Sequence, residues 1–360
     1  MGTKPDKRNG PAPRSRGTLY RARERLPWPA DRDFRILSID GGGIRGILPL
    51  ALLERLERTH LGGGSVAAYF DLIVGTSTGG IIALGLGAGL TSAQLFELYM
   101  DRGGEVFPDH GWAARLILDA GGLLFNRCDH RALDRLIEEI LGEKRIWESR
   151  VRLCVPAAET RHFEPFIFKT PHHPDYRLDW KEPMALAART TSAAPTFFPP
   201  VRNGGYEFVD GGVWANNPTM IGVADTLACF NLRREQIRVL SLGCVRSEFA
   251  MSWARRRLGG LWFWRGVFFE AMHVESHNVI GQTRLIAGGD RVLRADAPPV
   301  RPPIEMWNWA RSRSELPAMG DALFEEHSDR ISREFLNARA PAYRPFYTPA
   351  SPPGQSETHC

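Results

Sequence analysis

Residues 72–88 read LIVGTSTGGIIALGLGA, and this stretch decides the fold. An apolar run leads into the pattern G-x-S-x-G at residues 75–79, and a second apolar run follows it. A turn of this kind between a buried strand and a buried helix predicts a nucleophile elbow, in which Gly75 and Gly79 let the strand and the helix approach closely. The hydroxyl of Ser77 would then stand at the sheet edge, near the helix N-terminus, as a candidate nucleophile.

The same region raises the question of a membrane span, because residues 72–96 contain no charged side chain. A spanning helix needs about 20 predominantly apolar residues. This run contains six glycines together with serine, threonine and glutamine side chains. Such a composition favours a buried turn and helix of a globular protein over a membrane span.

Repeated strand–turn–helix units predict an α/β fold with a mainly parallel central sheet. Residues 34–40 form a β-prone run that ends on glycines, and residues 47–61 place leucines at helical spacing. The strand expected at 69–74 and the apolar helix after it repeat this order. Further expected elements are helices at 91–100 and 129–141 and strands at 151–155, 163–168 and 238–243.

The charge is distributed unevenly along the chain. The 360 residues have a net charge of +5, and residues 1–30 alone carry eight Lys or Arg and two acids, so the rest of the chain is near neutral. A near-neutral body argues against a nucleic-acid polymer as partner. We expect four parts, which are a flexible basic tail at 1–30, a catalytic core at 31–245 with order beginning near Phe34, a C-terminal helical part at 246–340 packed on the core, and a proline-rich tail at 341–360.

Cysteine usage and the N-terminus indicate the compartment. The five cysteines are widely spaced, without a C-x-x-C pair, which is typical of a reducing compartment and does not suggest a metal site. No apolar stretch follows the basic N-terminal residues, so they do not form a secretory signal peptide. We therefore expect a cytoplasmic protein.

A second glycine turn, DGGGIRG at residues 40–46, follows the first expected strand. It also matches the dinucleotide-binding pattern G-x-G-x-x-G, which requires an acidic residue about 20 positions further on to bind the ribose. Residues 61–66 contain no acid, and the Lys-Ser/Thr pair of a P-loop is absent as well. The remaining interpretation is an oxyanion hole of free backbone N–H groups, with Arg45 adding a positive charge for an anionic substrate group.

A third motif, Asp210-Gly211-Gly212, follows the apolar pair Phe208-Val209. An aspartate at the end of a strand, made accessible by glycines, can lie within hydrogen-bond distance of Ser77 and act as its base. Taken alone, D-G-G is usually no more than a turn.

In this order, the three motifs resemble the patatin-like phospholipase family, which combines a G-G-G-x-R-G loop, a G-x-S-x-G serine and a D-G-[GA] aspartate. Residues 191–200, TSAAPTFFPP, are similar to the family's segment before the aspartate. The resemblance covers residues 34 to about 220. It implies a three-layer α/β/α fold with a mainly parallel sheet and a nucleophile elbow.

The resemblance also implies the site and the chemistry. Ser77 would be the nucleophile and Asp210 its general base, acting on fatty-acyl esters of membrane glycerophospholipids without a metal or cofactor. The oxyanion would be bound by backbone N–H groups of Gly42, Gly43 and Arg45. The remaining motif glycines would shape the loops, and they are Gly41, Gly46, Gly75, Gly79, Gly211 and Gly212.

Two histidines allow an alternative base. Ser77, Asp210 and either His273 or His277 follow the Ser…Asp…His order of α/β-hydrolases. The two histidines, at i and i+4, also share a helical face on which zinc could bind if a third ligand were present. The family resemblance favours the Ser–Asp pair.

Residues 254–269 combine arginines with tryptophans and phenylalanines. This composition suits contact with the membrane interface, with arginines on lipid phosphates and aromatic rings in the headgroup layer. A core helix or the interface of a homo-oligomer is the alternative. The basic tail could also attract an anionic membrane, at about 1 kcal/mol per Lys or Arg, which predicts peripheral action at the inner membrane.

The layout as a whole resembles the cyclic-dinucleotide-activated phospholipases of bacterial anti-phage systems. A cyclic dinucleotide would then be an activator, bound by aromatic and arginine side chains. The candidates by residue type are Arg284, Trp307, Trp309 and Arg311. An unregulated housekeeping acyl hydrolase and a non-catalytic lipid-binding or storage protein of the same fold are the alternatives.

Overall fold

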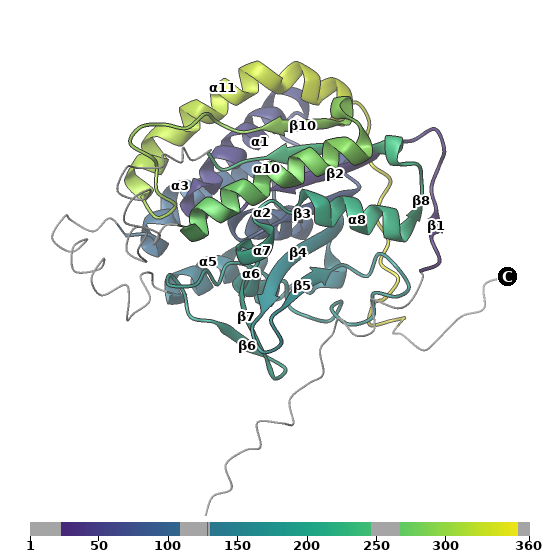
Figure 1. Ribbon diagram of the computed structural model, residues 1–360, viewed down its shortest axis with the longest axis horizontal. Coiled ribbons are helices and arrows are strands. Elements are labelled where there is room, and N and C mark those ends of the chain that lie inside the picture. The colour runs from purple at the N-terminus through teal and green to yellow at the C-terminus, as the bar shows by residue number, and fades with distance from the viewer. Residues whose placement is uncertain (1–22, 109–127, 129, 246–266, 352–360) are drawn as a thin grey trace, which may run out of the picture.

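A computed structural model describes residues 23–108, 128, 130–245 and 267–351, with side chains from Glu270 onward in the last range. At its centre lies an eight-stranded sheet in the order β10-β9-β2-β3-β4-β7-β6, with β5 paired to β4 (Figure 1). The five parallel strands are β2 (Phe34–Ile39), β3 (Leu72–Gly75), β4 (Arg152–Glu159), β9 (Ile237–Leu242) and β10 (Val292–Ala295). The three strands in antiparallel pairs are β5 (Glu164–Lys169), β6 (Val201–Asn203) and β7 (Tyr206–Asp210). The expected α/β fold with a mainly parallel sheet is thereby confirmed.

Side chains of the central strands alternate between two apolar layers. In β2, Phe34 and Ile36 join one buried cluster, whereas Leu37 and Ile39 join the other. The same alternation recurs in β3 and β9. Because successive residues of a strand point to opposite faces, a strand with buried apolar side chains on both faces must be covered on both sides. These strands are therefore central to a three-layer α/β/α arrangement.

Helices cover both faces of the sheet (Figure 1). One face is covered by α1 (Ile47–His60), α2 (Thr78–Ala88), α3 (Ser92–Val106), α5 (His130–Leu141), α6 (Met184–Thr191) and α11 (Trp309–Phe335). The other face carries α8 (Thr219–Cys229) and α10 (Val267–Ala287), with the short α7 (Gly212–Ala215) beside them. The 3-10 turns are η2 (Gly43–Gly46), η3 (Val66–Tyr69), η4 (Ile146–Glu148), η5 (Arg234–Gln236) and η6 (Gly289–Arg291).

The ends of the chain differ from the expected boundaries. Order begins before Phe34, because β1 (Leu26–Pro27) pairs with β8 (Phe230–Asn231) and Arg23 donates to the hydroxyl of Tyr176 at 2.7 Å. Residues 246–340 contribute β10 to the central sheet in addition to helices. Of the proline-rich end, the described residues 341–351 are irregular but attached, since the Phe346 N–H donates to the Pro171 carbonyl at 2.8 Å. Within the described ranges, no helix is both long and apolar enough to cross a bilayer.

Candidate active site

Ser77 lies in the sharp turn between β3 and α2, at the N-cap of the helix. Its backbone has φ 55° and ψ −121°, a strained conformation that costs a non-glycine residue about 1–3 kcal/mol. Glycines make the turn feasible, because a Cβ on Gly75 would lie 2.0 Å from the Gly79 carbonyl oxygen and one on Gly79 would lie 2.2 Å from that of Ile39. The geometry is that of a nucleophile elbow, with its serine at the carboxyl end of a parallel strand.

Asp210 ends β7 and is buried beside Ser77. Its carboxylate accepts a hydrogen bond from the Gly212 N–H at 2.7 Å, and the neighbouring Ser77 hydroxyl also favours its charged form. Burial outweighs both effects and raises the pKa of Asp210 to about 7. A carboxylate with this pKa can accept a proton near neutral pH and return it.

The turn at residues 41–46 lies against the elbow and is held by backbone hydrogen bonds at both sides. The Gly41 N–H donates to the Asn216 carbonyl and the Ile44 N–H to the Met306 carbonyl, each at 3.0 Å. The backbone N–H groups of Gly42 and Gly43 have no partner among the residues that the structure describes. They are thus available to an oxyanion in the pocket that both residues line with Ser77.

Arg45 differs from the two glycines. Its backbone N–H donates to the Gly42 carbonyl at 3.2 Å inside η2, so it is already used. Its side chain faces a second pocket, away from Ser77. We therefore leave Arg45 out of the proposed oxyanion hole.

An apolar pocket opens beside Ser77 and Asp210. Its walls come from α2, α3, α5 and the segment before β6, through Ile81, Val106, Leu133, Phe197 and Phe198 among others. Burying a hydrocarbon chain there is favourable by about 0.8 kcal/mol per CH₂ group. The pocket therefore suits a hydrocarbon chain of a ligand that reaches Ser77.

The two histidines of the alternative triad lie elsewhere. His273 and His277, whose ring centroids are 4.7 Å apart, line the second pocket on α10, whereas Ser77 and Asp210 line the first. No third metal ligand joins the histidine pair among the described residues. The geometry supports neither the triad nor a zinc site.

The four candidate nucleotide-binding residues do not converge on one site. Trp307 packs on Phe197, with ring centroids 5.2 Å apart, and Arg311 is paired with Glu315 at 2.7 Å. Trp309 lies against α3, where a Cβ on Gly103 would come 2.8 Å from its indole ring. Arg284 alone lines the second pocket. Of the expected membrane-contact segment at 254–269, residues 254–266 lie outside the described residues.

Two residues of the site were given no role from the sequence, although Thr191 begins the segment 191–200 that resembles the family. The Thr191 hydroxyl accepts the Ser77 N–H at 3.0 Å, and Asn216 lines both pockets with its Oδ1 buried and without a hydrogen-bond partner among the described residues. Asn216 belongs to the turn-prone Asn216-Asn217-Pro218, six residues after Asp210. That turn composition is the only sequence signal that could have pointed to it.

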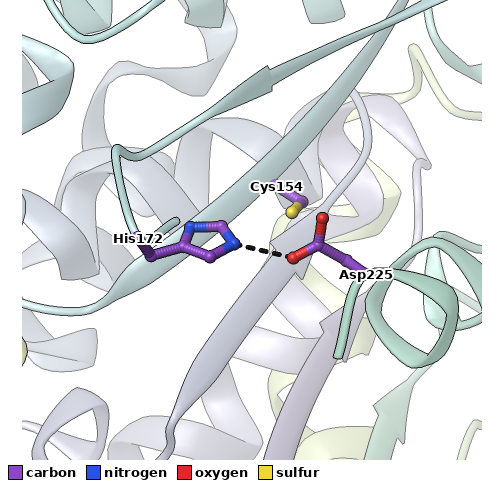
Figure 2. Close-up of side chains that lie close together, drawn as sticks. All are labelled: Cys154, His172 and Asp225. Atoms are coloured by element: carbon purple, nitrogen blue, oxygen red, sulfur yellow. Dashed lines mark hydrogen bonds and ion pairs between the residues drawn. The ribbon is translucent and has the colours of Figure 1, made fainter. Parts of the chain in front are cut away.

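A third cluster lies apart from both pockets. Cys154, His172 and Asp225 lie close together, with His172 Nε2 2.7 Å from Asp225 Oδ2 (Figure 2). Lys169 Nζ lies 2.6 Å from the other carboxylate oxygen of Asp225. Burial would raise the pKa of Asp225, but Lys169 and His172 hold it well below its usual value. Because the ammonium group repels a cation and the carboxylate already has partners, we assign this cluster to the structural core.

The fold and the elbow define an α/β protein with a serine nucleophile motif beside an apolar pocket. The family model of patatin-like phospholipase matches residues 37–223, more than half of the chain. The chain belongs to the patatin-like phospholipase family.

Relatives and a solved structure extend this comparison. The "cGAMP-activated phospholipase" of Vibrio cholerae serotype O1 is 34% identical over 238 residues, which cover 61% of this chain and 66% of the relative. Its namesake in Escherichia coli strain TW11681 is 33% identical over 230 residues, or 61% and 64% of the two chains. The alignments thus span just under two thirds of these relatives' own lengths. The crystal structure of VipD from Legionella pneumophila has a TM-score of 0.40 and 12% identity over 83% of this chain and 68% of that chain.

Proposed function

We propose that the protein is a serine acyl hydrolase that cleaves fatty-acyl esters of membrane glycerophospholipids. The observation that carries the proposal is that the elbow serine Ser77 and the buried carboxylate of Asp210 line the same apolar pocket, where the Ser77 side chain acts on that carboxylate. Family membership supports the substrate class.

The reaction proceeds through an acyl-enzyme. Asp210 accepts the proton of Ser77 while Ser77 Oγ attacks the ester carbonyl carbon. The negative charge on the carbonyl oxygen is bound by the N–H groups of Gly42 and Gly43, and by the positive end of α2. The tetrahedral intermediate then breaks its bond to the alcohol, which leaves with the proton from Asp210.

Water completes the cycle. Asp210, again ionised, takes a proton from a water molecule that attacks the acyl-enzyme carbonyl. The second tetrahedral intermediate releases the fatty acid and Ser77 Oγ recovers the proton from Asp210. No step needs a group other than the ester, water and the described residues.

The test is hydrolysis of a fluorogenic long-chain ester by the purified protein. S77A and D210N should each lower kcat/KM at least about 1000-fold with unchanged far-UV circular dichroism, because each removes one half of the Ser–Asp pair. H273A and H277A should retain activity. An inactive wild-type protein that still binds the ester would favour the lipid-binding or storage alternative, and inactive histidine variants would restore the triad.

We also propose that a cyclic dinucleotide activates this hydrolase. The proposal is supported by the relatives whose printed names describe activation by cGAMP. Ester hydrolysis measured with and without cGAMP tests it. A high rate that no nucleotide changes would favour the unregulated housekeeping hydrolase.

A further inference from the structure

A second pocket lies behind the turn that carries the proposed oxyanion donors. Three residues at the carboxyl ends of neighbouring parallel strands form its floor, and they are Asp40 after β2, Cys244 after β9 and Asp296 after β10. The helix α10 forms one wall, and Arg45 of η2 forms another. The pocket thus occupies one edge of the central sheet.

At this edge, between β9 and β2, the order in which the chain adds strands to the sheet reverses. From β2 the chain crosses to β3 through α1 on one face, whereas from β9 it crosses to β10 through α10 on the opposite face (Figure 1). Neighbouring strands with connections on opposite faces leave a crevice at their carboxyl ends, and open α/β sheets commonly bind ligands there. The topology therefore points to a ligand independently of the side chains.

The wall formed by α10 presents basic side chains in one stripe. His273, His277 and Arg284 follow helical spacing together with Ile280, and all four line the pocket. Another part of the same helix holds the loop after Asp210, since the carboxylate of Glu275 accepts the Asn217 N–H at 3.1 Å. One helix thus contacts both the second pocket and the loop that follows the proposed base.

Three arginines reach this pocket, and one of them is neutralised. The Arg294 guanidinium forms a bidentate ion pair with the Asp40 carboxylate, with N–O distances of 2.9 and 2.6 Å. It also donates to the Asp296 carboxylate at 2.9 Å. Arg294 offsets the charge of one of these two carboxylates, and burial raises the pKa of Asp40, which disfavours its charged form. The positive charge that a ligand would meet in this pocket therefore comes from the other two arginines, Arg45 and Arg284.

Neither Arg45 nor Arg284 has a carboxylate within ion-pair distance in the part of the chain that the structure describes. Among the described residues, the Arg45 guanidinium donates to two carbonyl oxygens, that of Gly42 at 3.3 Å and that of Ile304 at 3.5 Å. Burial lowers the pKa of this guanidinium and outweighs the opposite effect of Cys244, Glu305 and Asp296, which are not in ion-pair contact with it. Arg284 is exposed and has no hydrogen-bond partner among the described residues.

We infer that this pocket binds a phosphodiester-bearing ligand, whose phosphate oxygens pair with Arg45 and Arg284. Arginine recognises phosphate through parallel N–H donors, and the histidine stripe adds further donors. The inference rests on the proposed activation, and it names where the activator binds. It replaces Trp307, Trp309 and Arg311, which lie outside this pocket.

The pocket lies directly behind the oxyanion turn, so a ligand bound there can affect catalysis. Cys244 of its floor lies directly behind Gly42, since a Cβ on Gly42 would come 2.4 Å from Cys244 Cβ. Arg45 follows the two oxyanion glycines in the same turn, and Asn216 lines both pockets. A phosphate bound to Arg45 would therefore fix the turn whose N–H groups face the substrate carbonyl.

The test is binding to full-length S77A protein, which separates binding from hydrolysis. Isothermal titration calorimetry with cGAMP should show saturable binding. R284Q should raise the dissociation constant at least about tenfold, as expected for a lost charged hydrogen bond. R284K should retain part of the affinity. R344Q is the matched control, because Arg344 is exposed and lies outside both pockets, and it should bind as S77A does.

Parallel titrations identify the source of the phosphodiester. Inorganic phosphate tests a simple anion, and phosphatidylglycerol-containing vesicles, compared with phosphatidylcholine alone, test a lipid headgroup. Binding of either cGAMP or phosphatidylglycerol that depends on Arg284 supports the site and assigns its ligand. Equal binding by R284Q and R344Q for every probe overturns the inference, even if the wild-type protein hydrolyses esters. Binding that depends on Arg284 together with an inactive wild-type protein would overturn the proposed function alone.

Discussion

At the scale of single residues, the site depends on two unfavourable states that the fold imposes. Ser77 is held with a positive φ, and Asp210 is held in an apolar surrounding that disfavours its charged form. The favourable packing of the surrounding sheet and helices offsets the free energy of the strain at Ser77 and of the desolvation of Asp210. Strained or desolvated groups of this kind concentrate at catalytic sites, where the same features expose a nucleophile and tune a base.

The raised pKa of Asp210 predicts the pH dependence of hydrolysis. Only the ionised carboxylate accepts the Ser77 proton, so kcat/KM for a soluble ester should rise with pH to a plateau, with a midpoint near the pKa of about 7. Below that midpoint it should fall about tenfold per pH unit. A pH–rate profile with a midpoint near 4 would contradict a buried base.

The same pKa predicts a gain in stability on removing the charge. Because the folded pKa of about 7 lies above the unfolded value, folding takes up a proton between these values and stability falls as pH rises through that window. D210N has no titratable group at this position, so its stability does not fall with pH for this reason. Its melting temperature should exceed that of the wild type by several degrees at pH 8, and the difference should shrink at pH 5. D329N, which changes an exposed carboxylate, should show no such pH-dependent gain.

The residues that could be predicted from the sequence are those whose role is local. Ser77 and its flanking glycines form one continuous motif, so their geometry follows from the turn itself. Arg45 shows the limit, because the sequence places it in the oxyanion loop but only the three-dimensional hydrogen bonds reveal that its N–H is already used. Asn216 was missed because its contacts come from distant segments, including Gly41.

At the scale of secondary-structure elements, the elbow depends on how closely α2 approaches β2 and β3. A Cβ on Gly79 would lie 2.2 Å from the Ile39 carbonyl oxygen of β2, which real Cβ atoms do not tolerate. G79A must therefore push the helix away or disrupt the turn. We expect a loss of at least about 2 kcal/mol in the free energy of unfolding, measured by urea denaturation, as for other overpacked cores.

A second glycine serves as the control for this prediction. Gly281 lies within α10 with no atom near its would-be Cβ. G281A should leave stability unchanged or raise it by about 0.5–1 kcal/mol, since alanine is the better helix former. Equal destabilisation by G79A and G281A would show that the close approach at the elbow does not matter.

The elements marked by a continuous β-prone run or by helical spacing were predictable, whereas β1 and β10 were not. The strand at 34–40 matches β2 because it is a β-prone run, and the helix at 47–61 matches α1 because its leucines follow helical spacing. In contrast, β1 has two residues and β10 has four, too few for a period to be visible. Their place is decided by pairing with β8 and β9, which is a long-range contact.

At the scale of the whole molecule, both ends of the described chain are tied to the body. Trp28 packs on Phe34 and Phe230, with ring centroids 4.6 and 5.3 Å apart, and α11 packs along α1. Arg35 of β2 donates to the Phe335 carbonyl at 2.9 Å, so the last helix is joined to a central strand. The helical C-terminal part is therefore integral to the sheet rather than an appended module.

The charge of the basic N-terminus and its packing lie in different residues. Residues 23–30 contact the folded body, and residues 1–22 carry six Lys or Arg and one acid, equal to the whole net charge of +5. A charge concentrated there attracts an anionic membrane at about 1 kcal/mol per basic residue, and salt screens the attraction. Deletion of residues 1–22 should weaken sedimentation with phosphatidylglycerol-containing vesicles at low salt, and leave hydrolysis of a soluble ester unchanged.

Deletion of residues 1–30 is the comparison that separates charge from packing. It also removes Trp28 and β1, so its melting temperature should fall, whereas that of the shorter deletion should not. If the shorter deletion binds vesicles as the full chain does, the basic residues do not recruit the protein, and the membrane contact must lie on the body. In that case the net charge of +5, which residues 1–22 carry because residues 23–360 sum to zero, contributes to solubility rather than to membrane binding.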